Sequence, residues 1–242
     1  MHVVAITRLH GSMEAEADAL AADLGTLAYS ARLTLRAGVP AVVLETADGD
    51  QAAALAARLR QRGHGALACD TAAVAAARDL TLVRHFRLEP TALVVRTSAG
   101  DDALAWADIT ALVRATHRTE ARDVKVVSER TFDAGRAILT GGLSMSKNVK
   151  REVVTRTDES EPVLYLFRRG GPPWLLGQYR ANYDGLGAEL QPTAIANFVT
   201  TVARLRARAP RAHVDDRLLA RRTGTDELDL LAHLLVAGLA QA

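Results

Sequence analysis

Apolar and polar positions follow one another along the first 70 residues in a pattern that predicts alternating strands and helices. The run Val3-Val4-Ala5-Ile6 is typical of a short buried strand. Ser12 is a suitable N-cap for a helix whose apolar positions, at helical spacing, are Met13, Ala17, Leu20, Ala21 and Leu24. A second helix is expected over 27–37, where Gly38 and Pro40 end it. Its buried side is predicted to hold Leu27, Ala31, Leu35 and the Tyr29–Leu33 pair.

The next residues continue the alternation. Residues 40–46 are strand-like because of their valine pair and length. Asp48 or Asp50 is expected to cap a third helix, with an apolar stripe formed by Ala52, Leu55, Ala56 and Leu59. Arg58, Arg60 and Arg62 are predicted to lie on its solvated side, and residues 66–69 to form a closing strand. Cys69 within it is expected to be a buried, inert thiol.

This order of elements resembles the C-terminal domain of the bacterial ribosomal stalk protein and the adaptor of the Clp protease. The alanine- and arginine-containing helix before a proline turn, and the acid-capped helix ending in glycine, carry the resemblance over about residues 1–70. It implies a compact α/β fold that docks other proteins. Clp adaptors hold a peptide amino terminus with Asn-Asp after the first strand. In this sequence the corresponding residues are Thr7-Arg8-Leu9-His10, without Asn-Asp, so the resemblance does not imply binding of a peptide amino terminus.

From Leu80 onward the sequence changes from alanine-rich helical patterns to alternating strand patterns, which places a domain boundary near residues 72–80. The strand candidates lie at 82–88, 92–96, 104–114, 124–127, 153–157, 163–167 and 174–179. A helix over 193–209 ends at Pro210, and its predicted apolar stripe is Ile195, Phe198, Val199, Val202 and Leu205. The large aromatic residues Trp106, Trp174 and Tyr179 are expected in the core.

Many strands followed by one amphipathic helix resemble a pleckstrin-homology-like domain, and Leu104-Ala-Trp-Ala-Asp-Ile resembles a strand of its bacterial members. The resemblance covers about residues 80–209. It implies a binding domain whose ligand is a phosphoinositide headgroup, a peptide or another protein.

These patterns together predict an α+β protein. Residues 1–78 form a small α/β docking domain, 79–209 a pleckstrin-homology-like antiparallel β-barrel with a closing helix, and 210–242 a helical tail. One face of the last helix carries Leu228, Leu231, Leu234 and Leu235. We expect this face to pack on the chain itself, with a partner's groove or a second subunit as the alternative.

An inserted segment, residues 132–150, departs from the barrel pattern. Long loops in compact domains are usually functional or disordered. The candidate ligand- or partner-binding residues are Gly141, Gly142, Ser144, Lys147, Lys150 and Arg151. Their amide, hydroxyl and cationic donors suit an anion, and a flexible or self-associating hairpin is the competing interpretation. Ser144-Met-Ser-Lys147 matches Ser-x-x-Lys of serine acyl enzymes, but the accompanying motifs are missing.

Composition narrows the function classes. The 242 residues are 49% apolar with a formal net charge of +2, and the basic excess is densest over 130–156. Only 4% of residues are aromatic, which disfavours nucleic-acid binding. The histidines and the single cysteine show no metal-ligand spacing. Arginine in place of lysine and abundant alanine suggest a GC-rich bacterial genome.

We therefore expect a non-catalytic protein-interaction adaptor or scaffold in a bacterial cytoplasm, because apolar runs are too short to span a membrane and no signal-peptide pattern opens the chain. Its partner is another protein or a second copy, and no catalytic residue, metal or cofactor is assigned. The alternative is recruitment to an anionic lipid or phosphorylated ligand through the basic, glycine-rich insertion. An enzyme of another class is the further alternative, and a cleft that clusters Asp108, His117 and Glu120 would favour it.

Overall fold

The computed structural model describes residues 1–76, 80–132 and 146–239, with backbone alone at 73, 75 and 76 and over 119–132 and 146–159. The chain divides into two compact units. The first comprises residues 1–117 and 161–242, and the described parts of the second, residues 118–160, belong to two long neighbouring strands. Among the described residues, no helix is long and apolar enough to cross a membrane.

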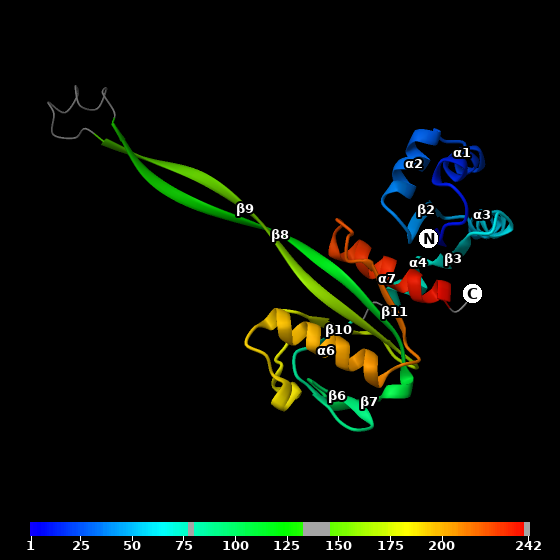
Figure 1. The fold of residues 1–242 in the computed structure, drawn as a ribbon. Helices are drawn as coiled ribbons and strands as arrows, with labels where there is room; N and C mark the ends of the chain where they lie inside the picture. Colours follow the sequence, from blue (N-terminus) through cyan, green and yellow to red (C-terminus); the bar gives the residue numbers. More distant parts are fainter. Residues whose placement is uncertain (77–79, 133–145, 240–242) are drawn as a thin grey trace. The chain divides into compact units, whose positions relative to one another are not determined.

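The N-terminal elements occur in the predicted order (Figure 1). They are β1 (His2–Arg8), α1 (Met13–Leu24), α2 (Ala28–Arg36), β2 (Ala41–Thr46), α3 (Gly49–Gln61), β3 (Gly65–Asp70) and a short α4 (Thr71–Ala76). The strands form a sheet of order β2-β1-β3, and β1 pairs antiparallel with both neighbours. Ser12 caps α1 by accepting a hydrogen bond from Ala15 N at 3.2 Å, and Asp48 caps α3. Both predicted caps are confirmed.

The central strand β1 is buried on both faces, which explains its unbroken apolar run. Successive side chains point to opposite faces of a sheet. Val4 and Ile6 belong to a core shared with α1, α2 and α3. Val3 and Ala5 belong to a second core shared with the last helix, α7 (Thr225–Leu239). The N-terminal sheet is therefore covered on its second face by the opposite end of the described chain.

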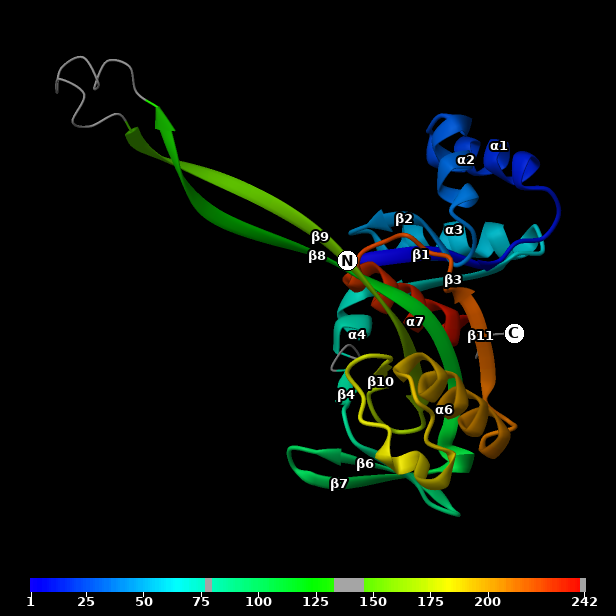
Figure 2. The same ribbon diagram turned by 60° about the vertical axis from the view of Figure 1, so that its left-hand side comes forward.

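The remaining elements form two further sheets and three helical pieces. They are β4 (Thr81–Val83), β5 (Phe86–Leu88), β6 (Ala92–Thr97), β7 (Gly100–Ala105), a 3-10 turn η1 (Trp106–Asp108), β8 (Ile109–Phe132), β9 (Ser146–Arg168), β10 (Trp174–Gly177), a 3-10 turn η2 (Asp184–Glu189), α6 (Ala194–Arg208) and β11 (His213–Leu218). The sheets have the orders β11-β8-β9-β10-β4 and β5-β6-β7 (Figure 2). The protein is thus mixed α+β, and none of the described sheets closes into a barrel.

The predicted strands at 104–114 and 124–127 do not stand apart. The second lies wholly within the 24-residue β8, and the first ends in it, while the candidates at 153–157 and 163–167 both belong to the 23-residue β9. The polar residues between the candidates suggest breaks, but the backbone of β8 and β9 stays extended through them. Polar residues do not by themselves end a strand, because one face of an antiparallel sheet can lie in water.

Two apolar cores lie on either side of the five-stranded sheet. One joins that sheet to β5–β7 and to the inner face of α6, through residues such as Phe86, Trp174 and Phe198. The other joins it to α7 and the N-terminal sheet. Leu228, Leu231, Leu234 and Leu235 are all buried, so the expected packing of the last helix on the chain itself is confirmed.

Several residues predicted to be buried are instead exposed. On α2, Leu27, Tyr29 and Leu33 are 75%, 66% and 49% exposed. On α6, Ile195 and Val199 are 57% and 56% exposed. Tyr179 is also exposed, whereas Trp174 is fully buried and Trp106 partly so. Cys69 is half-buried, and burial raises the pKa of its thiol. The wrong predictions on α2 and α6 share one cause, because apolar residues spread wider than one helix face cannot all face the core.

Candidate partner-binding site

The outward face of α2 is apolar although it is surrounded by solvent. Ala31 and Leu35 anchor the helix to the core, while Tyr29 and Leu33, four residues apart, point away from it. Leu27, the N-cap residue just before the helix, is also exposed. Isolated exposed leucines are ordinary, but two large apolar side chains on one face of a nine-residue helix form a patch of the kind that marks interaction sites. We call Tyr29 and Leu33 the α2 patch.

A basic cavity of about 440 Å³ begins at the C-terminal end of the same helix. Ala37, one turn beyond Leu33, lines it together with Arg36. Arg221 and Arg222 also line the cavity, as does the carboxylate of Glu227. The charged lining is therefore three arginines and one acid. Helix α2 itself contains no acidic residue. The α2 patch therefore leads into a cavity with an excess of positive charge.

Arg221 fixes the geometry of this cavity. Its Nη2 donates hydrogen bonds to the backbone oxygens of Gly38 and Pro40, in the turn between α2 and β2. Burial lowers the pKa of its guanidinium, and the nearby Glu227 carboxylate opposes that shift. The segment before α7 is thereby tied to the end of α2. In the described part of the chain, neither Arg36 nor Arg222 forms an ion pair.

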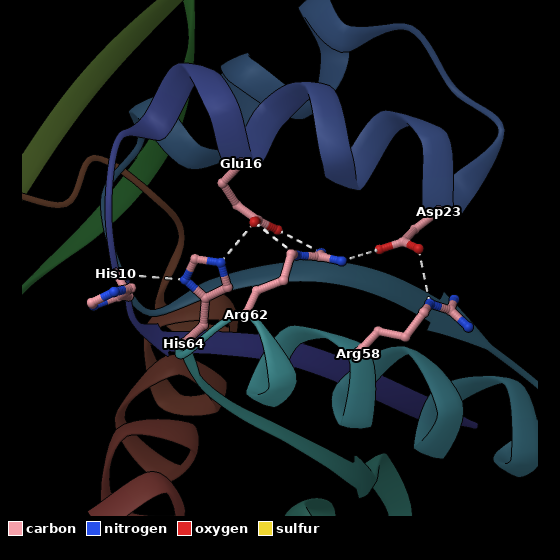
Figure 3. Close-up of polar contacts among 6 residues, drawn as sticks. All are labelled: His10, Glu16, Asp23, Arg58, Arg62 and His64. Carbon is pink, nitrogen blue, oxygen red and sulfur yellow. Dashed lines mark hydrogen bonds and ion pairs between the residues drawn. The ribbon is translucent and has the colours of Figure 1, made fainter.

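A charged network holds α1, the helix against which α2 packs (Figure 3). Arg62 donates to both oxygens of Glu16, at 2.9 and 2.7 Å, and to Asp23 at 2.8 Å. Arg58 completes the network with a 2.8 Å bond to Asp23. The hydrogen bonds to Glu16, assisted by Asp23, raise the pKa of Arg62 despite its partial burial. The predicted exposure is confirmed for Arg58 and Arg60, whereas Arg62 is partly buried, and Arg58 and Arg62 also join α3 to α1.

His64 extends this network in a defined tautomer. The backbone N–H of His10 donates to Nδ1 at 3.0 Å, so the ring carries its proton on Nε2. Nε2 in turn donates to Glu16 Oε2 at 2.6 Å. The buried Glu16 carboxylate is therefore satisfied by an arginine and a histidine, as a buried charge requires. This arrangement gives α1 and α2 a rigid support.

A second buried polar cluster lies beneath α7. The Tyr165 hydroxyl donates to the Asp229 carboxylate and lies 2.6 Å from His117 Nε2. Burial lowers the pKa of His117, and burial together with the Asp229 bond raises the pKa of Tyr165. Asp108 instead pairs with Arg169, and the side chain of Glu120 lies outside the description. The described residues do not bring Asp108 and His117 into one cleft.

The structure describes no side chain of the binding residues expected in the insertion. Gly141, Gly142 and Ser144 lie outside the described residues. Lys147, Lys150 and Arg151 belong to β9, and their side chains are outside the description as well. Their predicted role stays a prediction.

The α2 patch and its cavity were missed from the sequence. A signal was present, since the helix AYSARLTLR combines leucine, tyrosine and arginine without any acid. The contribution of Arg221 and Arg222 had no such signal, because the chain places them far from α2 and only the fold brings them together.

Comparisons of the chain with protein-family models, with curated proteins and with solved structures find no match.

Proposed function

We propose that this chain is a non-catalytic adaptor that binds an acidic, amphipathic segment of a partner protein through the α2 patch and the adjoining basic cavity. The observation that carries the proposal is the continuity of the two features. Tyr29 and Leu33 lead by helical spacing to Ala37, which lines the cavity of the three arginines. An apolar stripe followed by cations is complementary to a helix with apolar residues at i and i+4 and acids beyond them.

The energetics favour a modest, specific complex. Fully burying an aliphatic or aromatic side chain contributes roughly 1.5–3 kcal/mol, and the α2 patch offers two such side chains. Part of that gain is spent on ordering the partner segment. The rigid support from Glu16, Asp23 and Arg62 limits the cost on the side of this chain.

The proposal also includes the fold relationships suggested by the sequence. An antiparallel sheet with β1 in the middle supports a relationship of residues 1–70 to docking modules of the ribosomal stalk and Clp adaptor type. A core between β5–β7 and β8–β10, covered by α6, supports a pleckstrin-homology-like origin for 79–209. Both relationships belong to binding domains, and neither names a ligand.

A displayed library of 18-residue helical peptides, selected against the full chain, tests the function. We expect the selected sequences to carry two apolar residues at helical spacing followed by aspartate or glutamate. The double variant Y29A/L33A should bind a selected peptide about tenfold or more weakly, as truncated interface anchors do. Raising the salt concentration should weaken binding further by screening the arginines.

The matched control is I195A/V199A, which removes an equally exposed apolar pair with the same spacing from α6. It should change the affinity less than about twofold, because that pair lies away from the proposed interface. Selected peptides without acidic enrichment, or with equal affinity for Y29A/L33A and the unchanged chain, would contradict the proposal.

A further inference from the structure

A second cavity, of about 400 Å³, lies elsewhere in the first unit and shares no lining residue with the α2 surface. Its walls come from four places in the chain. They are the end of β1, the turn from α3 into β3, strand β11 and the last turn of α7. This volume is in the range of small-molecule sites.

The walls are fixed by hydrogen bonds. Arg217 donates to the Thr7 backbone oxygen at 2.6 Å and to the Asp215 carboxylate, which joins β11 to β1. Arg60 Nε donates to the Ala66 oxygen at 2.8 Å. Behind the wall, His64 is held by Glu16 at 2.6 Å (Figure 3). The cavity is thus bounded by side chains whose positions are set by the fold.

Glycine at 238 allows the wall of α7 to approach β1. A Cβ at this position would lie 2.8 Å from Thr7 Oγ1, closer than such atoms approach. Glycine inside a helix costs about 1 kcal/mol relative to alanine. The close approach of α7 to Thr7 accounts for that cost. It also brings the apolar side chains of Leu235 and Leu239 to the cavity.

The lining combines this apolar wall with cationic groups. Arg8, Arg60, His213 and Arg217 line the cavity. Asp215 binds Arg217 and also lies 3.7 Å from His213 Nε2, and Arg60 donates to the Ala66 oxygen, so Arg8 is the exposed cation that offers a carboxylate its main contact. A ligand that fits both parts has an apolar body and an anionic end. The end is better a carboxylate than a phosphate, because α7 reaches the cavity with its C-terminal end, whose partial negative charge disfavours a dianion more strongly.

We propose that this cavity binds an apolar group that ends in a single carboxylate. The chemistry is shared by a free monocarboxylate and by the C-terminal residue of a peptide with an apolar side chain. In either case the Arg8 guanidinium meets the carboxylate, and Leu235 and Leu239 meet the apolar body.

Calorimetric titration of the full chain tests the site with two probe series. The first contains linear monocarboxylates of four to ten carbons and their primary amides. The second contains pentapeptides ending in Val, Leu or Phe, each as the free acid and as the amide. We expect the acids of at least one series to bind and their amides to bind about tenfold or more weakly. Among the monocarboxylates, affinity should rise about fourfold per added methylene until the cavity is full.

The variant R8E should weaken binding of the acids about tenfold or more. The control R206E reverses an exposed arginine of α6 and should leave their affinity unchanged. Tight binding in the peptide series alone assigns the site to a chain end, and in the first series alone to a free acid. Both variants should bind the acidic helical peptide of the α2 surface normally, so failure of one site is read separately from failure of the other.

The proposal is overturned if no acid of either series binds below about 1 mM, a weak affinity by ordinary standards. It is equally overturned if acids and amides bind alike. A third contrary result is an R8E variant that unfolds at lower temperature yet binds the acids unchanged. Arg8 would then serve only to offset the C-terminal dipole of α7.

Discussion

Helices α2 and α6 look alike in outline and differ in how their charges are used. Each buries one apolar face, and each exposes an apolar pair four residues apart, Tyr29 and Leu33 on α2 and Ile195 and Val199 on α6. On α6, Arg204 pairs with Glu189, and Arg208 donates to a backbone oxygen and lies 5.3 Å from the Trp106 ring centroid. Both of these cations therefore have partners within the chain. Arg206 on the same helix is exposed and forms no ion pair among the described residues, but it is a single cation.

On α2 the balance is different. Arg36 and Arg222 form no ion pair in the part of the chain that the structure describes, and both line the basic cavity. The two helices therefore differ in how the cations near the exposed apolar pair are arranged. Where a cation stands alone or already has a partner, we interpret the pair as ordinary surface. Where several arginines line one cavity beside the pair, apolar and electrostatic complementarity favour the same partner.

The largest effects should come from the buried faces, where the two helices are equivalent. Phe198→Ala on α6 should lower the free energy of unfolding by about 3–5 kcal/mol, and Leu35→Ala on α2 by about 2–5 kcal/mol, because each leaves a cavity. Urea unfolding followed by circular dichroism measures both. A loss below about 1 kcal/mol for either would mean that this helix is not part of a cooperative core.

The next largest effect compares the carboxylates that form ion pairs beside the two helices. Glu16→Gln removes the carboxylate that accepts from Arg62 and His64 beneath α1, and should cost about 1–3 kcal/mol. Glu189→Gln, the matched change beside α6, affects an exposed pair and should cost about 0–1 kcal/mol. The same unfolding experiment measures both variants. An equal loss of unfolding free energy would show that the buried Glu16 network stabilises the fold no more than the exposed Glu189 ion pair.

A pH-dependent effect concerns β11, which follows α6 and is tied to β1. Burial alone would raise the pKa of Asp215, but hydrogen bonds from the side chain and backbone N–H of Arg217 outweigh it and lower that pKa. A carboxyl with a lowered pKa stabilises the fold above its unfolded value of about 3.9 and loses that contribution as pH falls further. Stability between pH 5 and 2 should therefore fall less steeply in Asp215→Asn. Identical acid profiles for the two proteins would show that this carboxylate is not linked to folding.

The smallest effects should come from the outward faces. Tyr29→Ala and Ile195→Ala should each change the free energy of unfolding by no more than about 0.5 kcal/mol, as exposed substitutions usually do. Only the first should reduce binding of the acidic peptide. A destabilisation above about 1 kcal/mol for Tyr29→Ala would indicate that its ring packs within the chain, contrary to its exposure.

Local signals in the sequence were sufficient to predict the strands and helices of the N-terminal region. The caps Ser12 and Asp48, the glycines and the apolar spacing predicted the order of strands and helices correctly, because these signals act over a few residues. The prediction that Tyr29 and Leu33 face the core was wrong. Four-residue spacing says that two side chains share a face, but only tertiary packing decides whether that face is turned inward.

The basic cavity and the Glu16 network could not be predicted in the same way. Arg62 and Glu16, or Arg36 and Arg221, are brought together by packing of elements far apart in the chain. A charge pattern along one helix does not indicate which distant carboxylate or arginine will face it. The insertion residues that the sequence did single out remain a prediction, to be tested by experiment.

The position of α7 has a consequence for the order of folding. This helix follows every other described strand and helix, yet it covers β1, the first of them, and packs against the five-stranded sheet. Until α7 has been synthesised, Val3 and Ala5 have no complete covering on that face. A chain that joins its first and last elements in one core forms many non-local contacts, and such topologies fold slowly. We therefore expect the N-terminal sheet and the five-stranded sheet to reach the native state together, after α7 has been synthesised, and not one after the other.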